Sequence, residues 1–215
     1  MINNREDGIH IDSIIFDLDG TIWDSIDTVL MAWNSIVEEN EKVKRKLTRR
    51  DFEGTMGLQM DGISSKLFPN LDLNTRTKII KQCFEIEGKY IEEHGGVLFE
   101  NVEVSLYNLS KKYNLFIVSN CQQGYIEGFF QYHKLKNYFL DYEIPSRTGL
   151  AKGDNIKLII ERNKLSKPVY VGDTEGDLKA SRYAGIPFVY AKYGFGNISE
   201  YDQVIKKFDD LLNLF

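Results

Sequence analysis

The sequence predicts an α/β fold in which a parallel sheet is interrupted by an inserted helical domain. Short apolar runs of strand type recur along much of the chain, and helical patterns follow most of them. Between Trp23 and Gly96 this alternation stops and only helical patterns remain. The 215 residues suffice for one sizeable core and a smaller second domain. We therefore expect a core domain of residues 1–22 and 97–215 and a helical domain of residues 23–96.

The strands of the predicted sheet are apolar runs rich in β-branched and aromatic residues. The clearest runs are residues 11–16, 115–118, 169–171 and 186–190. A weaker strand is expected within residues 138–144. The C-terminal end predicts a last strand at Val204-Ile205 and a closing helix within residues 208–215. Because helical patterns separate most of the strands, we expect the strands to run parallel.

The inserted segment carries two amphipathic helical patterns and one short helix. In residues 24–39, apolar side chains recur at helix-face spacing. Thr48 is a candidate N-cap for a short helix that contains Phe52. Asn74 is a candidate N-cap for a long helix that Gly95-Gly96 would end. Three glycines favour a loop between these helices, namely Gly54, Gly57 and Gly62.

Composition narrows the classes of function. A formal net charge of −5 argues against a general nucleic-acid binder, although small anionic partners remain possible. The N-terminal residues are polar and lack the apolar region of a secretory signal, and no apolar run reaches membrane-spanning length. Cys83 and Cys121 have no CxxC spacing, so neither a zinc site nor a disulfide framework is indicated. We expect a cytoplasmic monomer or homodimer with no nucleic-acid or membrane partner.

Three predicted strands end in side chains that can bind a metal ion or a phosphate. These are Asp17 and Asp19 after the first strand, Ser119 and Asn120 after the second, and Asp173 and Asp177 after a later one. In an open parallel sheet the ligand crevice lies beyond the carboxyl ends of the strands, so these residues should converge. Four carboxylates would repel one another, and a hard divalent cation relieves that repulsion. All-oxygen ligands in a cytoplasmic protein favour Mg²⁺.

Such a site suits phosphoryl transfer, because the charge on the phosphate oxygens must be neutralised. Lys152 could supply a fixed positive charge beside the metal. Asp17 ends its strand and can act as the nucleophile. Asp19, two residues further on, can protonate the leaving alkoxide and later take a proton from the attacking water.

With these residues in place, the sequence resembles the haloacid dehalogenase-like (HAD) phosphohydrolase superfamily. The first motif of that superfamily, DxDGT, appears as residues 17–21, with Gly20 and Thr21 at its end. The Ser/Thr of the second motif fits Ser119, the lysine of the third fits Lys152, and the acidic pair of the fourth fits Asp173 and Asp177. Four motifs in the family's order are far more specific than one.

The resemblance implies a three-layer, Rossmann-like core and a small helical cap, as in phosphoglycolate phosphatase-like and β-phosphoglucomutase-like members. It implies that Asp17 and Asp173 are side-chain ligands of Mg²⁺. Asp19 would give its backbone carbonyl, and Asp177 would ligate or orient a bound water. The resulting candidates for binding phosphate are Gly20, Thr21, Ser119, Asn120 and Lys152.

The leading hypothesis is therefore a Mg²⁺-dependent phosphatase of a small phosphorylated metabolite, acting through an aspartyl-phosphate. A phosphomutase would use the same intermediate on a sugar bisphosphate and is the second enzyme hypothesis. Carbon–halogen hydrolysis is disfavoured because it needs neither the second aspartate nor a metal. A non-catalytic Mg²⁺-binding regulatory protein is the alternative from another class. The motifs do not name the substrate.

Two remaining patterns have a functional and a structural interpretation. Trp23 and Trp33 are expected to pack inside the helical domain, although Trp23 is close enough to the first motif to contact substrate. The basic run of residues 42–50 could attract an anionic substrate, but such runs more often form a solvated face.

Overall fold

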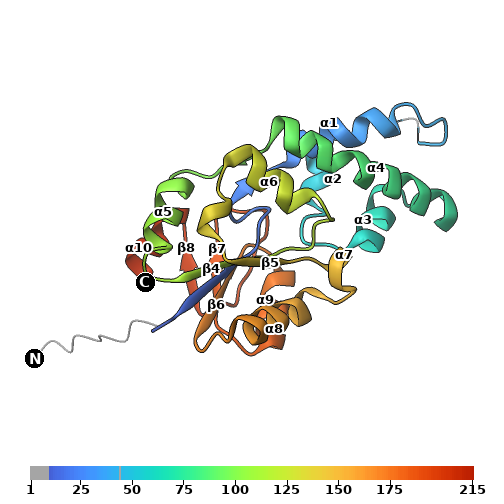
Figure 1. The fold of residues 1–215 in the computed structure, drawn as a ribbon. Coiled ribbons are helices and arrows are strands. Elements are labelled where there is room, and N and C mark those ends of the chain that lie inside the picture. The colour runs from blue at the N-terminus through green and yellow to red at the C-terminus, as the bar shows by residue number, and fades with distance from the viewer. Residues whose placement is uncertain (1–9, 44) are drawn as a thin grey trace, which may run out of the picture.

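A six-stranded sheet forms the centre of the computed structural model, which describes residues 10–43 and 45–215 (Figure 1). The spatial order is β5-β4-β1-β6-β7-β8, and every adjacent pair is parallel. The strands are β1 (Ser13–Phe16), β4 (Asn114–Val118), β5 (Asp141–Glu143), β6 (Pro168–Gly172), β7 (Phe188–Ala191) and β8 (Gln203–Ile205). The predicted parallel α/β fold is confirmed. Because the order reverses at β1, the ligand crevice is expected beyond the carboxyl ends of β1, β4 and β6.

Helices cover both faces of the sheet and complete three layers (Figure 1). Side chains alternate between the faces of β1: Ile14 and Phe16 pack into one hydrophobic cluster, and Ile15 packs into the other. The first cluster includes side chains of α5 (Val102–Leu109), α6 (Tyr125–His133) and α10 (Leu211–Leu214). The second includes side chains of α8 (Lys152–Asn163) and α9 (Glu175–Ala184). Burial on both faces explains why the strands are continuous apolar runs.

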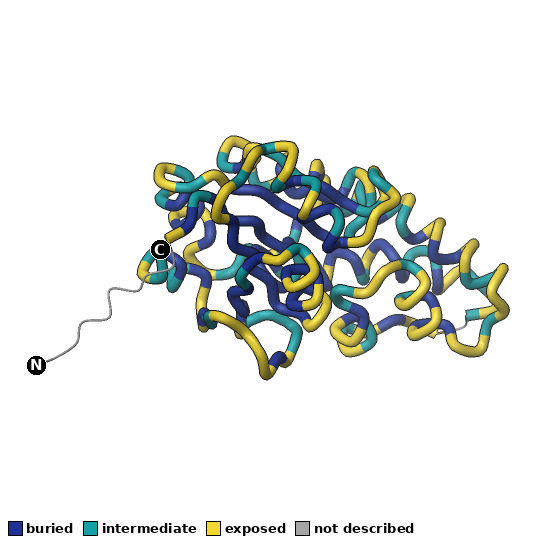
Figure 2. Tube along the Cα trace, turned by 90° about the horizontal axis from the view of Figure 1, so that it is seen from below, coloured by how far each residue is buried: buried dark blue, intermediate teal, exposed yellow. Residues whose placement is uncertain are grey.

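Four helices between β1 and α5 form what we call the helical segment (residues 26–94). They are α1 (Ile26–Val37), α2 (Arg49–Glu53), α3 (Met60–Leu67) and α4 (Leu73–His94). α1 and α3 pack against α4, and α4 also packs against α6, which joins the segment to the rest of the molecule. In Figure 2 the buried part of the tube is concentrated in the sheet, and the helical segment extends from it with exposed outer turns.

Two strands at the ends of the helical segment were not expected. β2 (Trp23–Asp24) pairs antiparallel with β3 (Val97–Leu98), although no strand was predicted between Trp23 and Gly96. A two-residue strand carries too little periodicity to be recognised in sequence, and pairing between distant residues creates it. The β2–β3 pair brings the entry and the exit of the helical segment side by side.

The helical segment also corrects two predictions made from local signals. α3 occupies residues for which the glycines indicated a loop, and Gly62 lies inside it. Burial of Ser64 and Leu67 outweighs the low helix propensity of that glycine. The N-cap of α4 is Asp72, whose side chain accepts a hydrogen bond from the Thr75 amide, rather than Asn74.

Other predicted elements lie close to their expected bounds. Thr48 and Asp51 form a capping box at α2, as the N-cap assignment indicated. The closing segment forms the 3₁₀ turn Phe208–Asp210 followed by α10. The remaining short elements are α7 (Pro145–Thr148) and the 3₁₀ turn Lys136–Tyr138. Among the residues that the structure describes, no helix combines the length and the apolarity needed to cross a membrane.

Candidate active site

Asp17 lies at the end of the central strand with its carboxylate buried. Its amide donates a hydrogen bond to the Val171 carbonyl on β6, which continues the ladder one residue beyond β1. The residue is 3% exposed and lines a cavity of about 80 Å³ between the sheet edge and the helical segment. Lys152 Nζ donates a hydrogen bond of 2.8 Å to Asp17 Oδ1. The carboxylate therefore has a fixed position and faces the cavity.

Lys152 joins two of the candidate carboxylates. It is the first residue of α8 but is only 6% exposed, and its Nζ also donates a 2.7 Å hydrogen bond to Asp177 Oδ1. Burial opposes the positive charge, but the charges of Asp17 and Asp177 outweigh it and raise the pKa of Lys152 well above its usual value. The ammonium group is thus a permanent cation in the lining of the cavity.

Asp177 has a second, structural attachment. Its carboxylate Oδ2 accepts hydrogen bonds from the Thr174 amide at 2.9 Å and the Thr174 hydroxyl at 2.6 Å. These contacts form the capping box that begins α9. The capping box and the ion pair with Lys152 fix Asp177 beside Asp173.

Three carboxylates form a compact group that fits a hard cation. Oxygens of Asp17, Asp173 and Asp177 all lie within 4.8 Å of one another, and Asp173 Oδ1 is buried without a hydrogen-bond partner among the described residues. Burial and the charges of Asp177 and Asp17 raise the pKa of Asp173 well above its usual value. Burial and the charge of Asp177 raise the pKa of Asp17 to about 7, although Lys152 opposes the rise. An oxygen-only set of this kind suits Mg²⁺, which would favour the charged carboxylates.

Glycines around Asp173 allow this packing, and the sequence analysis missed two of them. A Cβ on Gly20, which has φ +79°, would come within 2.2 Å of Asp173 Oδ2. A Cβ on Gly194 would lie 2.5 Å from the same oxygen, and one on Gly196 would lie 2.1 Å from the Asp173 carbonyl oxygen. Between them, the Phe195 amide donates a 2.7 Å hydrogen bond to Asp173 Oδ2. The Gly-x-Gly spacing after the predicted strand was the available signal.

Asp19 is held by three hydrogen-bond donors that sequence reasoning did not assign. Trp23 Nε1, Ser25 Oγ and the Tyr125 hydroxyl donate to Asp19 Oδ1 at 2.9, 2.6 and 2.8 Å. Burial raises the pKa of Asp19 above its usual value, although hydrogen bonds from Ser25, Tyr125 and Trp23 oppose the shift. The side chain lines the cavity, as expected of a proton donor and acceptor.

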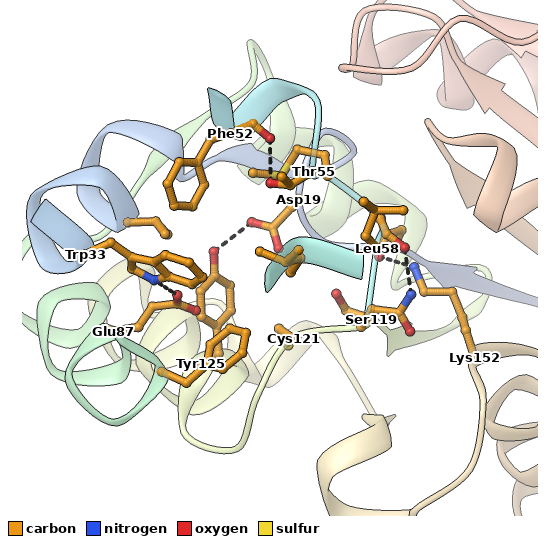
Figure 3. A pocket seen from close by; sticks show the side chains of 17 residues that line it. Asp19, Trp33, Phe52, Thr55, Leu58, Glu87, Ser119, Cys121, Tyr125 and Lys152 are labelled. Carbon is orange, nitrogen blue, oxygen red and sulfur yellow. Dashed lines mark hydrogen bonds and ion pairs between the residues drawn. The ribbon is translucent and has the colours of Figure 1, made fainter. Parts of the chain in front are cut away.

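Two predicted phosphate-binding residues line the cavity. Ser119 is buried at the end of β4 and has its side chain at the cavity wall (Figure 3). Asn120 Nδ2 donates a 3.0 Å hydrogen bond to the Gly57 carbonyl in the loop between α2 and α3. Asn120 Oδ1 is buried without a partner in the described part of the chain. Asn120 therefore connects the sheet edge to the helical segment.

Gly20 and Thr21, the other two predicted phosphate-binding residues, lie in the turn after β1. Their amides donate to the Trp23 and Leu18 carbonyls within the turn after β1, and neither residue lines the cavity. Thr21 is fully buried, and its carbonyl accepts a 2.7 Å hydrogen bond from the Tyr193 hydroxyl. In this structure the two residues shape the turn that carries Asp19.

The two tryptophans have different environments. Trp23 does not line the cavity; its indole packs edge-on against Tyr125 and Phe129 of α6, outside the helical segment. Trp33 packs inside the helical segment, as expected, but its ring also forms part of the cavity wall.

Cations of the basic run have acidic partners on the protein surface. Arg49 pairs with Asp24 and Asp27, and Arg45 pairs with Asp51. No residue of this run that the structure describes lines the cavity. The arrangement favours the interpretation of a solvated face.

A family model described as haloacid dehalogenase-like hydrolase matches residues 14–191. The phosphoglycolate phosphatase of Salmonella typhimurium is 24% identical over 241 residues, covering 94% of this chain and 92% of that protein. The phosphoglycolate phosphatase of Escherichia coli (strain K12) is 24% identical over 253 residues, covering 98% and 94%.

Solved structures show the same fold. A haloacid dehalogenase-like family hydrolase from Streptococcus pneumoniae superposes with a TM-score of 0.81 at 21% identity, covering 94% of this chain and 97% of that chain. A predicted phosphoglycolate phosphatase from Haemophilus somnus superposes with a TM-score of 0.80 at 21% identity, covering 95% and 97%.

Proposed function

The chain belongs to the haloacid dehalogenase-like hydrolase family, and we propose that it is a Mg²⁺-dependent phosphatase of a small phosphorylated metabolite. The observation that carries the proposal is the buried Asp17 carboxylate, which faces the cavity beside the Lys152 ammonium and the other acidic side chains. Asp19 lies at the same cavity. These groups supply a nucleophile, a fixed cation and a proton carrier.

In the first step, Asp17 attacks the phosphorus atom of the substrate. The bond from phosphorus to the leaving oxygen breaks as the bond to the Asp17 carboxylate forms, and Asp19 gives its proton to the leaving oxygen. Burial supports this role because it raises the pKa of Asp19 and favours the protonated carboxyl. Lys152 and Ser119 line the cavity, and their ammonium and hydroxyl groups would neutralise and hold the phosphate oxygens.

In the second step, Asp19 takes a proton from water as the water oxygen attacks the phosphorus. The bond between phosphorus and Asp17 breaks, and inorganic phosphate leaves with the Asp17 carboxylate restored. The three donors to Asp19 Oδ1 hold the carboxyl in one orientation through both proton transfers.

Side chains of Asp17 and Asp173 would hold Mg²⁺, with the Asp19 carbonyl and a water oriented by Asp177 as further ligands. When bound, the cation neutralises charge on the transferred phosphate. The helical segment would act as a cap, with Asn120 and Gly57 forming one contact across the cavity.

Phosphate release from a panel of phosphate monoesters, including phosphoglycolate, sugar phosphates and an activated aryl phosphate, tests the proposal. We expect release that needs Mg²⁺, is abolished by EDTA and is lost in Asp17→Asn, whose amide keeps the shape of the carboxylate but is a poor nucleophile. The Asp17→Asn variant should remain folded, as judged by its melting temperature. Fast isomerisation of a sugar phosphate with slow hydrolysis would instead identify a mutase. Full activity of Asp17→Asn would refute the assignment of the nucleophile.

A further inference from the structure

The wall of the cavity furthest from Lys152 contains a buried carboxyl group that the proposed mechanism does not use. Glu87 on α4 is 5% exposed and lines the cavity. Trp33 Nε1 donates a hydrogen bond to Glu87 Oε2, whereas Oε1 has no partner among the described residues. In Figure 3, Glu87, Trp33 and Phe52 lie on one side of Asp19, and Ser119 and Lys152 lie on the other.

Aromatic rings surround this carboxyl. Trp33 packs edge-on against Phe52 and Phe84 at centroid separations of 5.0 and 5.3 Å, and all three rings line the cavity. Tyr125 lines it as well. Aromatic faces combined with one carboxyl group, whose charged form a nearby cation stabilises, form an environment that attracts an ammonium group.

The same wall is poorly suited to an anion. Lys152 is the only cationic side chain that lines the cavity in the described part of the chain, and Asp17 and Asp177 already pair with it. A second negative charge on the substrate would face Glu87 and apolar rings without a counter-charge. The cavity would therefore disfavour a substrate whose end opposite the phosphate is a carboxylate.

Resting on the proposed phosphatase activity, we infer that the substrate is the phosphate monoester of a small amino alcohol. Its phosphate would lie between Asp17 and Lys152, and its ammonium group would donate a hydrogen bond to Glu87 Oε1 against the aromatic rings. Asp19 lies between the two ends, where the leaving oxygen would be.

Three phosphate esters of similar length test which charge the cavity wall prefers at the end of the substrate opposite the phosphate. This end is positive in phosphoethanolamine, neutral in propyl phosphate and negative in phosphoglycolate. We expect kcat/KM for phosphoethanolamine to exceed that for propyl phosphate by at least about tenfold, since a hydrogen bond to a charged group is worth that much. Phosphoglycolate should be the poorest of the three. Equal values for the first two esters, or a preference for phosphoglycolate, would overturn the inference.

Substitution of Glu87 links the preference to one side chain. In Glu87→Gln the ratio of phosphoethanolamine to propyl phosphate should fall close to one. Glu85→Gln is the matched control, because it makes the same change of side chain on the exposed face of the same helix. The ratio should be unchanged in Glu85→Gln. An unchanged ratio in Glu87→Gln would overturn the inference.

A second measurement needs only the wild-type enzyme. Burial raises the pKa of Glu87 to about 8, so the carboxylate becomes more populated as the pH rises. The ratio of the two kcat/KM values should therefore increase between about pH 7 and about pH 8.5. The other titratable groups near Glu87 are Asp19, Cys83, Cys121 and Tyr125. Burial raises the pKa of each thiol and of the Tyr125 hydroxyl, so the two thiols and the hydroxyl stay neutral between about pH 7 and about pH 8.5. A ratio independent of pH would count against Glu87 as the counter-charge.

An activated aryl phosphate separates failure of this inference from failure of the proposed function. Hydrolysis of the aryl ester without a preference for phosphoethanolamine overturns the inference alone. If no ester is hydrolysed, the phosphatase proposal fails, and titration of ethanolamine and propanol by calorimetry tests charge recognition by itself. If ethanolamine binds more tightly than propanol, and Glu87→Gln loses this difference, the inference is supported. Equal binding of the two alcohols overturns the inference.

Discussion

Replacing Glu87 by glutamine should make the free energy of unfolding less dependent on pH. Burial raises the pKa of the Glu87 carboxyl from 4.5 to about 8, although the hydrogen bond from Trp33 opposes the rise. The unfolded chain releases this proton near pH 4.5, whereas the folded chain keeps it until about pH 8. The contribution of Glu87 to stability is therefore complete below pH 4.5 and is lost as the pH rises to about 8. At about 1.4 kcal/mol per pH unit, the loss reaches at most about 5 kcal/mol.

Urea unfolding across this pH range, on wild type, Glu87→Gln and the control Glu85→Gln, measures the effect. The amide introduced by Glu87→Gln would keep an oxygen that can accept the hydrogen bond from Trp33, so this variant should remain folded. The free energy of unfolding of Glu87→Gln relative to wild type should rise by about 2–5 kcal/mol between the acidic and the alkaline end. Groups that titrate identically in both proteins cancel in this difference. Parallel profiles for wild type and Glu87→Gln would refute the reasoning that a buried, protonated acid lies in the cavity wall.

Four further substitutions, two at the site and two at glycines of α4 and α6, have outcomes that the structure predicts. Gly194→Ala would place a Cβ 2.4 Å from Asp173 Cβ, so we expect Mg²⁺ affinity measured by calorimetry to fall about tenfold or more; unchanged affinity would contradict the role of the close packing of Gly194 against Asp173. Tyr125→Phe removes one donor to Asp19, so kcat should fall about tenfold with little change in KM, and an unchanged kcat would show that the remaining donors suffice. Gly88→Ala should stabilise α4 by about 0.5–1 kcal/mol, because the added Cβ meets nothing closer than 3.9 Å. In contrast, Gly128→Ala should destabilise the protein by about 1–3 kcal/mol in thermal or urea unfolding, because its Cβ would lie 2.9 Å from Ile91 Cγ2.

Two features in and beside the helical segment were not predicted from local sequence, because packing and pairing between distant residues decide them. Gly62 indicated a loop but lies in α3, because burial of Leu67 stabilises the helix. β2 and β3 each have two residues and exist only because the ends of the helical segment meet. Neither feature is encoded in a pattern that a short window of sequence can show.

The sequence by itself determined the α/β fold and the identity of the main acidic and cationic candidates. Apolar runs that end in Asp17 and Asp173 placed those residues at the carboxyl edge of a parallel sheet, and strand order then brings them together. Lys152 was recognised only from motif order, and the structure brings its ammonium group to Asp17 and Asp177.

Only the tertiary structure decided what surrounds these groups. The donors to Asp19 come from β2, its flanking turn and α6, and the residue pair Tyr125 and Asp19 is separated by 106 positions. Glu87 lies in a helix whose pattern indicates only an amphipathic surface, and packing of α4 against α1 turns its carboxyl toward Trp33 and the cavity. The charge and the hydrogen-bond partners of a buried side chain such as Glu87 depend on residues that are distant in sequence. The spacing of neighbouring residues along the chain does not specify them.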